Sequence, residues 1–150
     1  MPTLLVVHHT CSPALQELLE AVVAGARDPE IEGVDVVVRA ALSASAAEVL
    51  GADGFVLGTP VNLGYMSGAL KHFFDTIYYP CLEATVRRPY GLYVHGNNDT
   101  TGAVRAVGSI TTGLKWRQVQ EPVSVVGQVG RADVEACREL GALAAATLLD

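Results

Sequence analysis

Short apolar runs alternate with amphipathic stretches along the chain, and this alternation limits the fold more than any other feature. Valine- and leucine-rich runs typical of buried strands occupy residues 4–8, 34–39, 55–59, 90–95 and 119–126. Apolar residues recur at helical spacing in residues 15–23, 45–50, 70–77, 104–114 and 134–149. Five strand–helix units in series predict an α/β fold, with a parallel sheet between two layers of helices. The common order for five such strands is 2-1-3-4-5.

Local signals mark where these elements begin and end. Ser12 is a good N-cap, and Pro13 suits the first helical position, where its missing N–H costs nothing. Gly25 is expected at the end of the first helix, and Gly51 is expected to stop the second in left-handed geometry. Pro122 interrupts the last apolar run, which predicts a bulge, an edge or an unpaired position there.

Composition narrows the class of protein. The chain has 150 residues, half of them apolar, with sixteen acidic and ten basic residues and a net charge of −6. These values predict one domain over residues 1–150 and argue against a disordered chain or a nucleic-acid-binding protein. No apolar run approaches the roughly 20 residues that span a bilayer, and no signal peptide is evident. Three widely spaced cysteines favour a reducing compartment, so we expect a cytoplasmic location: Cys11, Cys81 and Cys137.

Polar loops follow strands one, three and four, at residues 8–15, 58–67 and 95–102. In the order 2-1-3-4-5 these strands are neighbours, so the loops converge at the edge where ligands bind in such sheets. The first loop offers hydroxyls and N–H groups at a helix N-terminus without Lys or Arg, which suits a cofactor phosphate. The second can wall a flat heteroaromatic ring. Each loop alone could be an ordinary connection, but together they predict a ligand site.

Other ligand sites of α/β proteins are missing from the sequence. A low-molecular-weight phosphatase needs C-x5-R, but the sixth residue after Cys11 is Glu17. A receiver domain needs an acid after the third strand, where this chain has Thr59. Neither G-x-G-x-x-G nor a P-loop occurs. The histidines at 8, 9 and 95 have no acidic partner nearby, so we expect no metal site.

Residues 58–75 carry a family resemblance. They read GTPVNLGYMSGALKHFFD and resemble the G-[ST]-P-x-x-x-G-x-[MP]-[ST]-[GA]-x-[LM]-K-x-F-x-D segment of the flavodoxin-like superfamily, most closely its NADPH-dependent FMN reductase branch. The resemblance implies a flavodoxin-like three-layer sandwich that binds FMN. It implies that the phosphate is held by Thr10, Ser12, Ala14 and Leu15. It implies that one side of the isoalloxazine is walled by Pro60, Val61, Asn62, Leu63 and Gly64, and the other by His95, Gly96, Asn97 and Gly102.

The same resemblance implies an oxidoreductase in which NAD(P)H passes a hydride to flavin N5 and electrons go on to a flavin or a quinone. The first alternative is an electron carrier that has no nicotinamide site and docks a redox protein. The second is a flavodoxin-like shell that has lost FMN, because the first loop and Asn62 depart from the family pattern. A homodimer through the third and fourth helices is compatible with the sequence.

Several other residues have two interpretations. Cys11 follows the first strand and is expected to be an ordinary packed thiol. Trp116 is expected in the core or at a subunit contact rather than against the flavin. The pair Arg87-Arg88 is interpreted as a solvated turn or as a guide for a nicotinamide phosphate. Three aromatic residues are expected at the flavin mouth or on a dimer face: Tyr65, Tyr78 and Tyr79.

Overall fold

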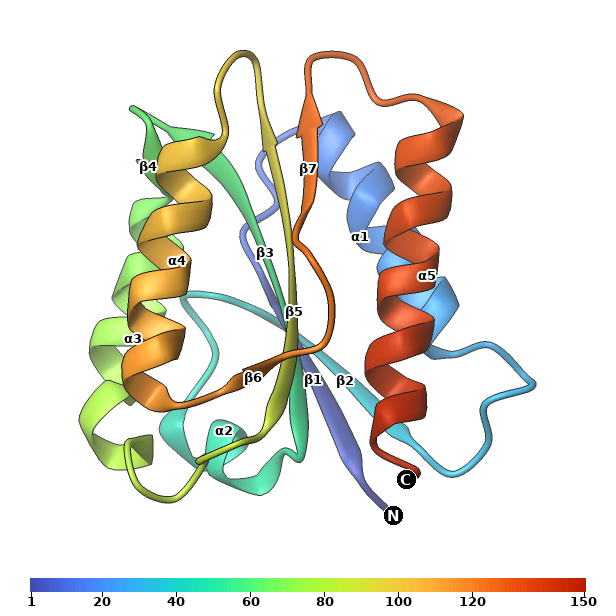
Figure 1. Ribbon diagram of the computed structural model, residues 1–150, viewed down its shortest axis with the longest axis vertical. Helices are drawn as coiled ribbons and strands as arrows, with labels where there is room; N and C mark the ends of the chain where they lie inside the picture. Colours follow the sequence, from blue (N-terminus) through green and yellow to red (C-terminus); the bar gives the residue numbers. More distant parts are fainter.

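Helices pack on both faces of a twisted sheet in the computed structural model, which describes residues 1–150 (Figure 1). The main strands are β1 (Thr3–His8), β2 (Asp35–Ala40), β3 (Gly54–Asn62) and β5 (Pro89–Gly96). They lie in the order β2-β1-β3-β5, and every pair is parallel. The short strands β6 (Arg117–Gln118) and β7 (Val123–Val126) both pair with β5, and β4 (Tyr65–Met66) pairs antiparallel with β3.

The predicted order 2-1-3-4-5 is confirmed, with the fifth strand divided in two. β6 pairs with the start of β5 and β7 with its end, so the strand leaves the sheet between them. Pro122 lies in this break, immediately before β7. Because proline has no N–H for the ladder, the unpaired position is the one that tolerates it.

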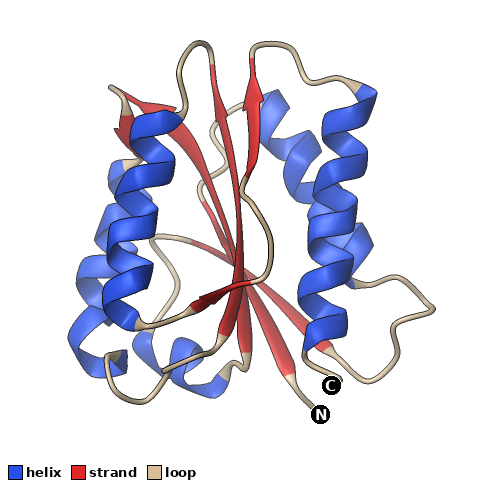
Figure 2. Cartoon of the chain, viewed as in Figure 1, coloured by secondary structure: helices blue, strands red, loops and turns tan.

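The helices divide into two layers (Figure 2). One face of the sheet is covered by α1 (Pro13–Ala26) and α5 (Arg131–Thr147). The other is covered by α2 (Ala46–Gly51), α3 (Gly68–Cys81) and α4 (Thr101–Leu114). Alternate residues of the central strands enter the two cores, as Leu4 and Leu5 do, which explains why these strands are apolar throughout.

The contact between α1 and α5 revises the role of one glycine. Gly25 lies inside α1, and a Cβ added there would overlap the carbonyl oxygen of Arg138 on α5. Gly141 has the reciprocal position, because its Cβ would overlap the carbonyl of Val22. The helix ends at Ala26, one residue after Gly25, close to the predicted end. In addition, the glycine lets two helix backbones approach closely.

The end of α2 also differs from the prediction. Gly51 is the last helical residue and has no positive φ. Instead, the Arg88 guanidinium donates hydrogen bonds to the carbonyls of Val49, Leu50 and Ala52, at the end of the helix. Arg88 therefore caps α2 and is not part of a solvated turn, a role that depends on a contact 36 to 39 residues away in sequence.

Trp116 belongs to the core, as predicted. Its ring stacks on Phe55 with centroids 4.2 Å apart, and its Nε1–H donates to the buried Thr85 hydroxyl at 2.8 Å. No helix of the fold is both long enough and apolar enough to cross a membrane.

Candidate functional site

Three loops meet at the carboxyl edge of the sheet, at the top of Figure 1. They are the β1–α1 loop, the β3–β4 hairpin and the β5–α4 loop. Between them lies a cavity of about 170 Å³. Its lining comes from all three loops: Cys11, Ser12, Leu15, Pro60, Val61, Asn62, His95, Gly96 and Asn97. The convergence expected from the strand order therefore occurs.

The β1–α1 loop presents unpaired hydrogen-bond donors. Ser12 is the N-cap of α1, and its hydroxyl accepts the Leu15 N–H at 3.2 Å. The backbone N–H groups of Cys11, Ser12 and Ala14 donate to no acceptor within the protein. Because they lie at the positive end of the α1 dipole, they can bind an anion without a lysine or arginine in the cavity wall.

Two histidines precede these donors. The Nδ1 atom of His8 lies 2.8 Å from the Thr10 hydroxyl, so Thr10 turns towards the end of β1 and away from the cavity. Burial, with the neighbouring charge of His9, lowers the pKa of His8. His8 is therefore a largely neutral hydrogen-bonding partner that fixes the start of the loop.

The second loop is a tight hairpin. β3 continues through Asn62, which pairs with Tyr65, and the two turn residues have positive φ: 52° at Leu63 and 73° at Gly64. Two successive positive φ values characterise the type I′ turn that fits the twist of a hairpin. The base of the hairpin is held by the buried Thr59 hydroxyl, which accepts the Ser67 N–H at 3.0 Å.

The third loop is anchored at both ends. His95 Nε2 lies 2.7 Å from the carbonyl oxygen of Gly127, beyond β7. At the other end the Asp99 carboxylate accepts hydrogen bonds from the hydroxyl and backbone N–H of Thr101, which lower the pKa of Asp99. Asn97 is exposed between these anchors and lines the cavity. The loop therefore presents an amide on a fixed backbone.

Glycines lock the second and third loops together. Gly96 lies so near Val61 that an added Cβ would be 3.0 Å from the Val61 Cβ. A Cβ on Gly102 would overlap the carbonyl oxygen of Gly64. The hairpin and the third loop are therefore in close backbone contact.

The structure brings most of the sequence-predicted site residues to the cavity but not all of them. The five that lie outside its lining are Thr10, Ala14, Leu63, Gly64 and Gly102. Leu63 is fully exposed at the hairpin tip, and Gly102 lies beneath the hairpin.

Sequence reasoning missed two residues. Cys11 is exposed and lines the cavity, so the expectation of a packed thiol was wrong; its position between Thr10 and Ser12 was the available signal. The Gly127 carbonyl that anchors His95 had no local signal, because it is 32 residues distant.

Other candidate residues lie elsewhere. Tyr78 and Tyr79 are on the second half of α3, remote from the three loops, where their rings meet edge to face at 5.3 Å. They therefore do not line the cavity mouth. No three His, Cys, Asp or Glu side chains come together in an arrangement that could hold a metal ion.

The family model for NADPH-dependent FMN reductases matches residues 14–130, more than half of the chain. The chain belongs to this family. The matched range includes the hairpin and the third loop but begins after most of the first loop. Membership in this family supports FMN as the cofactor.

Individual relatives are flavodoxin-like. A protein of Aquifex aeolicus (strain VF5) described as a flavodoxin is 35% identical over 77 residues, which are 51% of this chain and 40% of the relative. A solved flavodoxin from the domain Archaea superimposes with a TM-score of 0.83 at 17% identity, covering 99% of both chains. A flavodoxin, WrbA-like protein from Agrobacterium tumefaciens gives 0.79 at 19% identity, covering 98% of this chain and 97% of the other. These structural similarities establish the flavodoxin-like fold.

Proposed function

We propose that the chain binds FMN in the three-loop cavity and acts as an NAD(P)H-dependent oxidoreductase that passes electrons to a small flavin or quinone. The observation that carries this proposal is the cluster of unpaired N–H groups at Cys11, Ser12 and Ala14, placed beside a cavity walled by the other two loops. Family membership supplies the identity of the cofactor.

The donor set fits a phosphate monoester. Three backbone N–H groups without a protein acceptor and the Ser12 hydroxyl lie at the start of α1, where the helix dipole favours an anion. The cavity lining has no lysine or arginine. Neutral donors and a helix dipole suit a cofactor phosphate that stays bound better than a phosphate that is transferred during catalysis.

The walls fit one part of a flat ring system. Pro60 and Val61 offer apolar surface, while Asn62 and Asn97 offer amide groups at its rim. His95 Nε2 donates to a carbonyl, so in the neutral ring Nδ1 is left as an acceptor. The cavity is smaller than the roughly 300–1,000 Å³ of a typical ligand pocket. It therefore encloses part of the cofactor and leaves the rest open to a second reactant.

FMN, when bound, supplies hydride acceptance and onward electron transfer. In this proposal the chain contributes position and environment rather than an acid or a base. The α1 start would hold the phosphate. The hairpin and the third loop, linked through Gly64 and Gly102, would hold the ring edge and keep one face free for a nicotinamide.

The second candidate is an electron carrier for a redox protein, which the similarity to a curated flavodoxin favours. Against it, the third loop has one carboxylate, Asp99, whereas a carrier that steers basic partners needs a strong acidic field. The third candidate is a flavodoxin-like protein that has lost FMN. In each case we expect a cytoplasmic protein, because its three cysteines are free and Cys11 is exposed.

The first experiment separates these candidates. The purified chain is titrated with FMN by fluorescence quenching, and the loaded protein is then titrated anaerobically with NADPH and with NADH while the visible spectrum is recorded. We expect saturable binding and bleaching within seconds. Bound flavin that neither nucleotide reduces would favour the carrier. Absence of FMN binding would refute the cofactor assignment.

A substitution at Ser12 tests the phosphate position. Ser12→Asp keeps a good N-cap but adds a negative charge, whereas Ser12→Asn keeps the cap without the charge. Two like charges about 4 Å apart near a protein surface repel by about 4 kcal/mol. We therefore expect Ser12→Asp to weaken FMN binding at least about tenfold and Ser12→Asn to change it much less. Equal affinities for the two variants would contradict this placement.

A further inference from the structure

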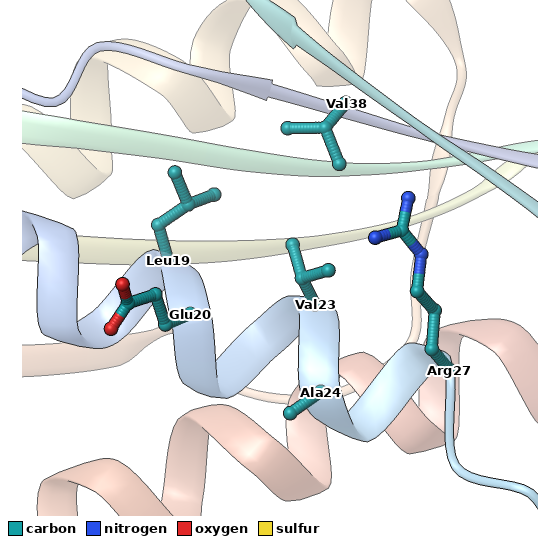
Figure 3. Close-up of a pocket in the computed structure, with 6 residues that line it drawn as sticks. All are labelled: Leu19, Glu20, Val23, Ala24, Arg27 and Val38. Carbon is teal, nitrogen blue, oxygen red and sulfur yellow. The ribbon is translucent and has the colours of Figure 1, made fainter.

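The strand β2 ends the sheet on one side and has a groove on each of its faces, one mainly apolar and the other mainly polar. Between β2 and α1 lies a groove of about 530 Å³, lined mainly by apolar side chains that include Leu19, Val23 and Val38 (Figure 3). On the opposite face a second groove of about 250 Å³ has Leu5 and Val37 at its base and is otherwise lined mainly by polar and charged residues, among them Asp35 and Arg39. The three consecutive valines of β2 are only half-buried. An unpaired edge strand whose centre is three half-buried valines is open to a further strand.

The backbone of β2 is arranged to accept such a strand. At the two ends of β2, the N–H groups of Asp35 and Ala41 donate to β1-side carbonyls, those of Pro2 and His8. Because alternate residues of a strand face the same neighbour, the N–H and C=O groups of Val36 and Val38 point to the open edge. Their carbonyls accept hydrogen bonds from the side chains of Arg27 and Arg39, respectively, at 3.1 and 3.0 Å.

The charges of β2 form a self-complementary pattern. The sequence Asp-Val-Val-Val-Arg is symmetric about Val37, with an acid two residues before it and a base two residues after it. Asp35, Val37 and Arg39 share one face of the strand and line the same groove. Arg39 is paired with Glu48, whereas the exposed Asp35 carboxylate makes no ion pair.

We propose that two copies of this chain associate by antiparallel pairing of β2 with β2, centred on Val37. This register places Asp35 of each copy opposite Arg39 of the other, in a position where cross-strand side chains interact directly. It also matches Val36 with Val38, the residues whose N–H and C=O groups point outwards, so each pair exchanges two hydrogen bonds. A shift by one residue would lose both matches, which makes the register specific.

The arginines that cover the edge have new partners in this dimer. Arg39 leaves the Val38 carbonyl for Asp35 of the other copy. Arg27 leaves the Val36 carbonyl. It lies at one end of the groove between α1 and β2, and Glu20 lies at the other end (Figure 3). Glu20 and Arg27 are seven residues apart, about 10 Å along a helix. The two-fold axis reverses one α1 relative to the other and so brings these opposite charges towards each other across the interface.

The test is a charge-swap series measured by sedimentation equilibrium over a range of protein concentrations. Asp35→Arg and Arg39→Asp each create like-charge pairs across the interface, and we expect each to raise the dimer dissociation constant at least about tenfold. The double variant restores opposite charges and is expected to return the constant to near that of the unchanged chain. Glu83→Arg, an exposed site after α3, makes the same change in charge as Asp35→Arg away from β2 and should have no such effect.

Amide hydrogen exchange provides a second measurement on the unchanged chain. The Val36 and Val38 amides are expected to exchange more slowly as the protein concentration rises, because pairing protects them. A chain that is monomeric at every concentration would overturn the proposal. So would a dimer that Asp35→Arg leaves intact and whose Val36 and Val38 amides gain no protection, since its interface would then lie elsewhere, such as on α3 and α4.

Discussion

Replacing Gly102 by alanine tests whether the hairpin and the third loop form one rigid wall. Gly102 is the second residue of α4, and an added Cβ would overlap the carbonyl oxygen of Gly64 at the hairpin tip. Backbone has to move, because neither partner has a flexible side chain at the contact. Overpacking of this kind typically costs about 1–3 kcal/mol. Alanine regains up to about 1 kcal/mol of helix propensity, which leaves a net loss of about 0–3 kcal/mol.

Gly108→Ala is the matched control in the same helix, because nothing lies within 4 Å of its added Cβ. It should stabilise the chain by up to about 1 kcal/mol. Urea unfolding followed by circular dichroism gives both free energies, and a fluorescence titration gives FMN affinity. We expect Gly102→Ala to be less stable than Gly108→Ala and to bind FMN at least about fivefold more weakly, since the displaced hairpin carries one cavity wall. Equal stability and equal affinity in the two variants would refute the coupling of the loops.

Two further predictions concern stability. Thr85→Val removes the acceptor of the buried Trp116 indole N–H and should lower the free energy of unfolding by about 1–3 kcal/mol, measured by urea denaturation; an unchanged value would show that the indole finds another acceptor. The pKa of His8 is lowered in the folded chain. As the pH falls below the ordinary value of 6.5, His8 is therefore protonated in the unfolded chain before it is protonated in the folded chain. The free energy of unfolding should therefore decrease from about pH 6.5 downwards, and His8→Gln should remove part of that decrease; an identical pH profile in the variant would contradict the assignment.

The sequence predicted the element order and the place of the site because both depend on local patterns. Alternating strand and helix periodicity defined the five units, and the serine caps at positions 12 and 67 are local hydrogen bonds between near neighbours. Strand order then brought three loops to one edge through a general rule of chain topology. The loop residues expected at the site were for that reason mostly found around one cavity.

What the sequence did not provide are contacts between residues distant in the chain. The Gly25 approach to α5, the Arg88 cap on α2 and the His95 link to Gly127 each join segments more than 30 residues apart. Local patterns determine which segments become helices, because helix hydrogen bonds close within four residues, and apolar runs of a few residues mark the strands. Which glycine is a close contact, which arginine is a cap and which loop residues face the cavity were decided only when packing fixed the distances between segments.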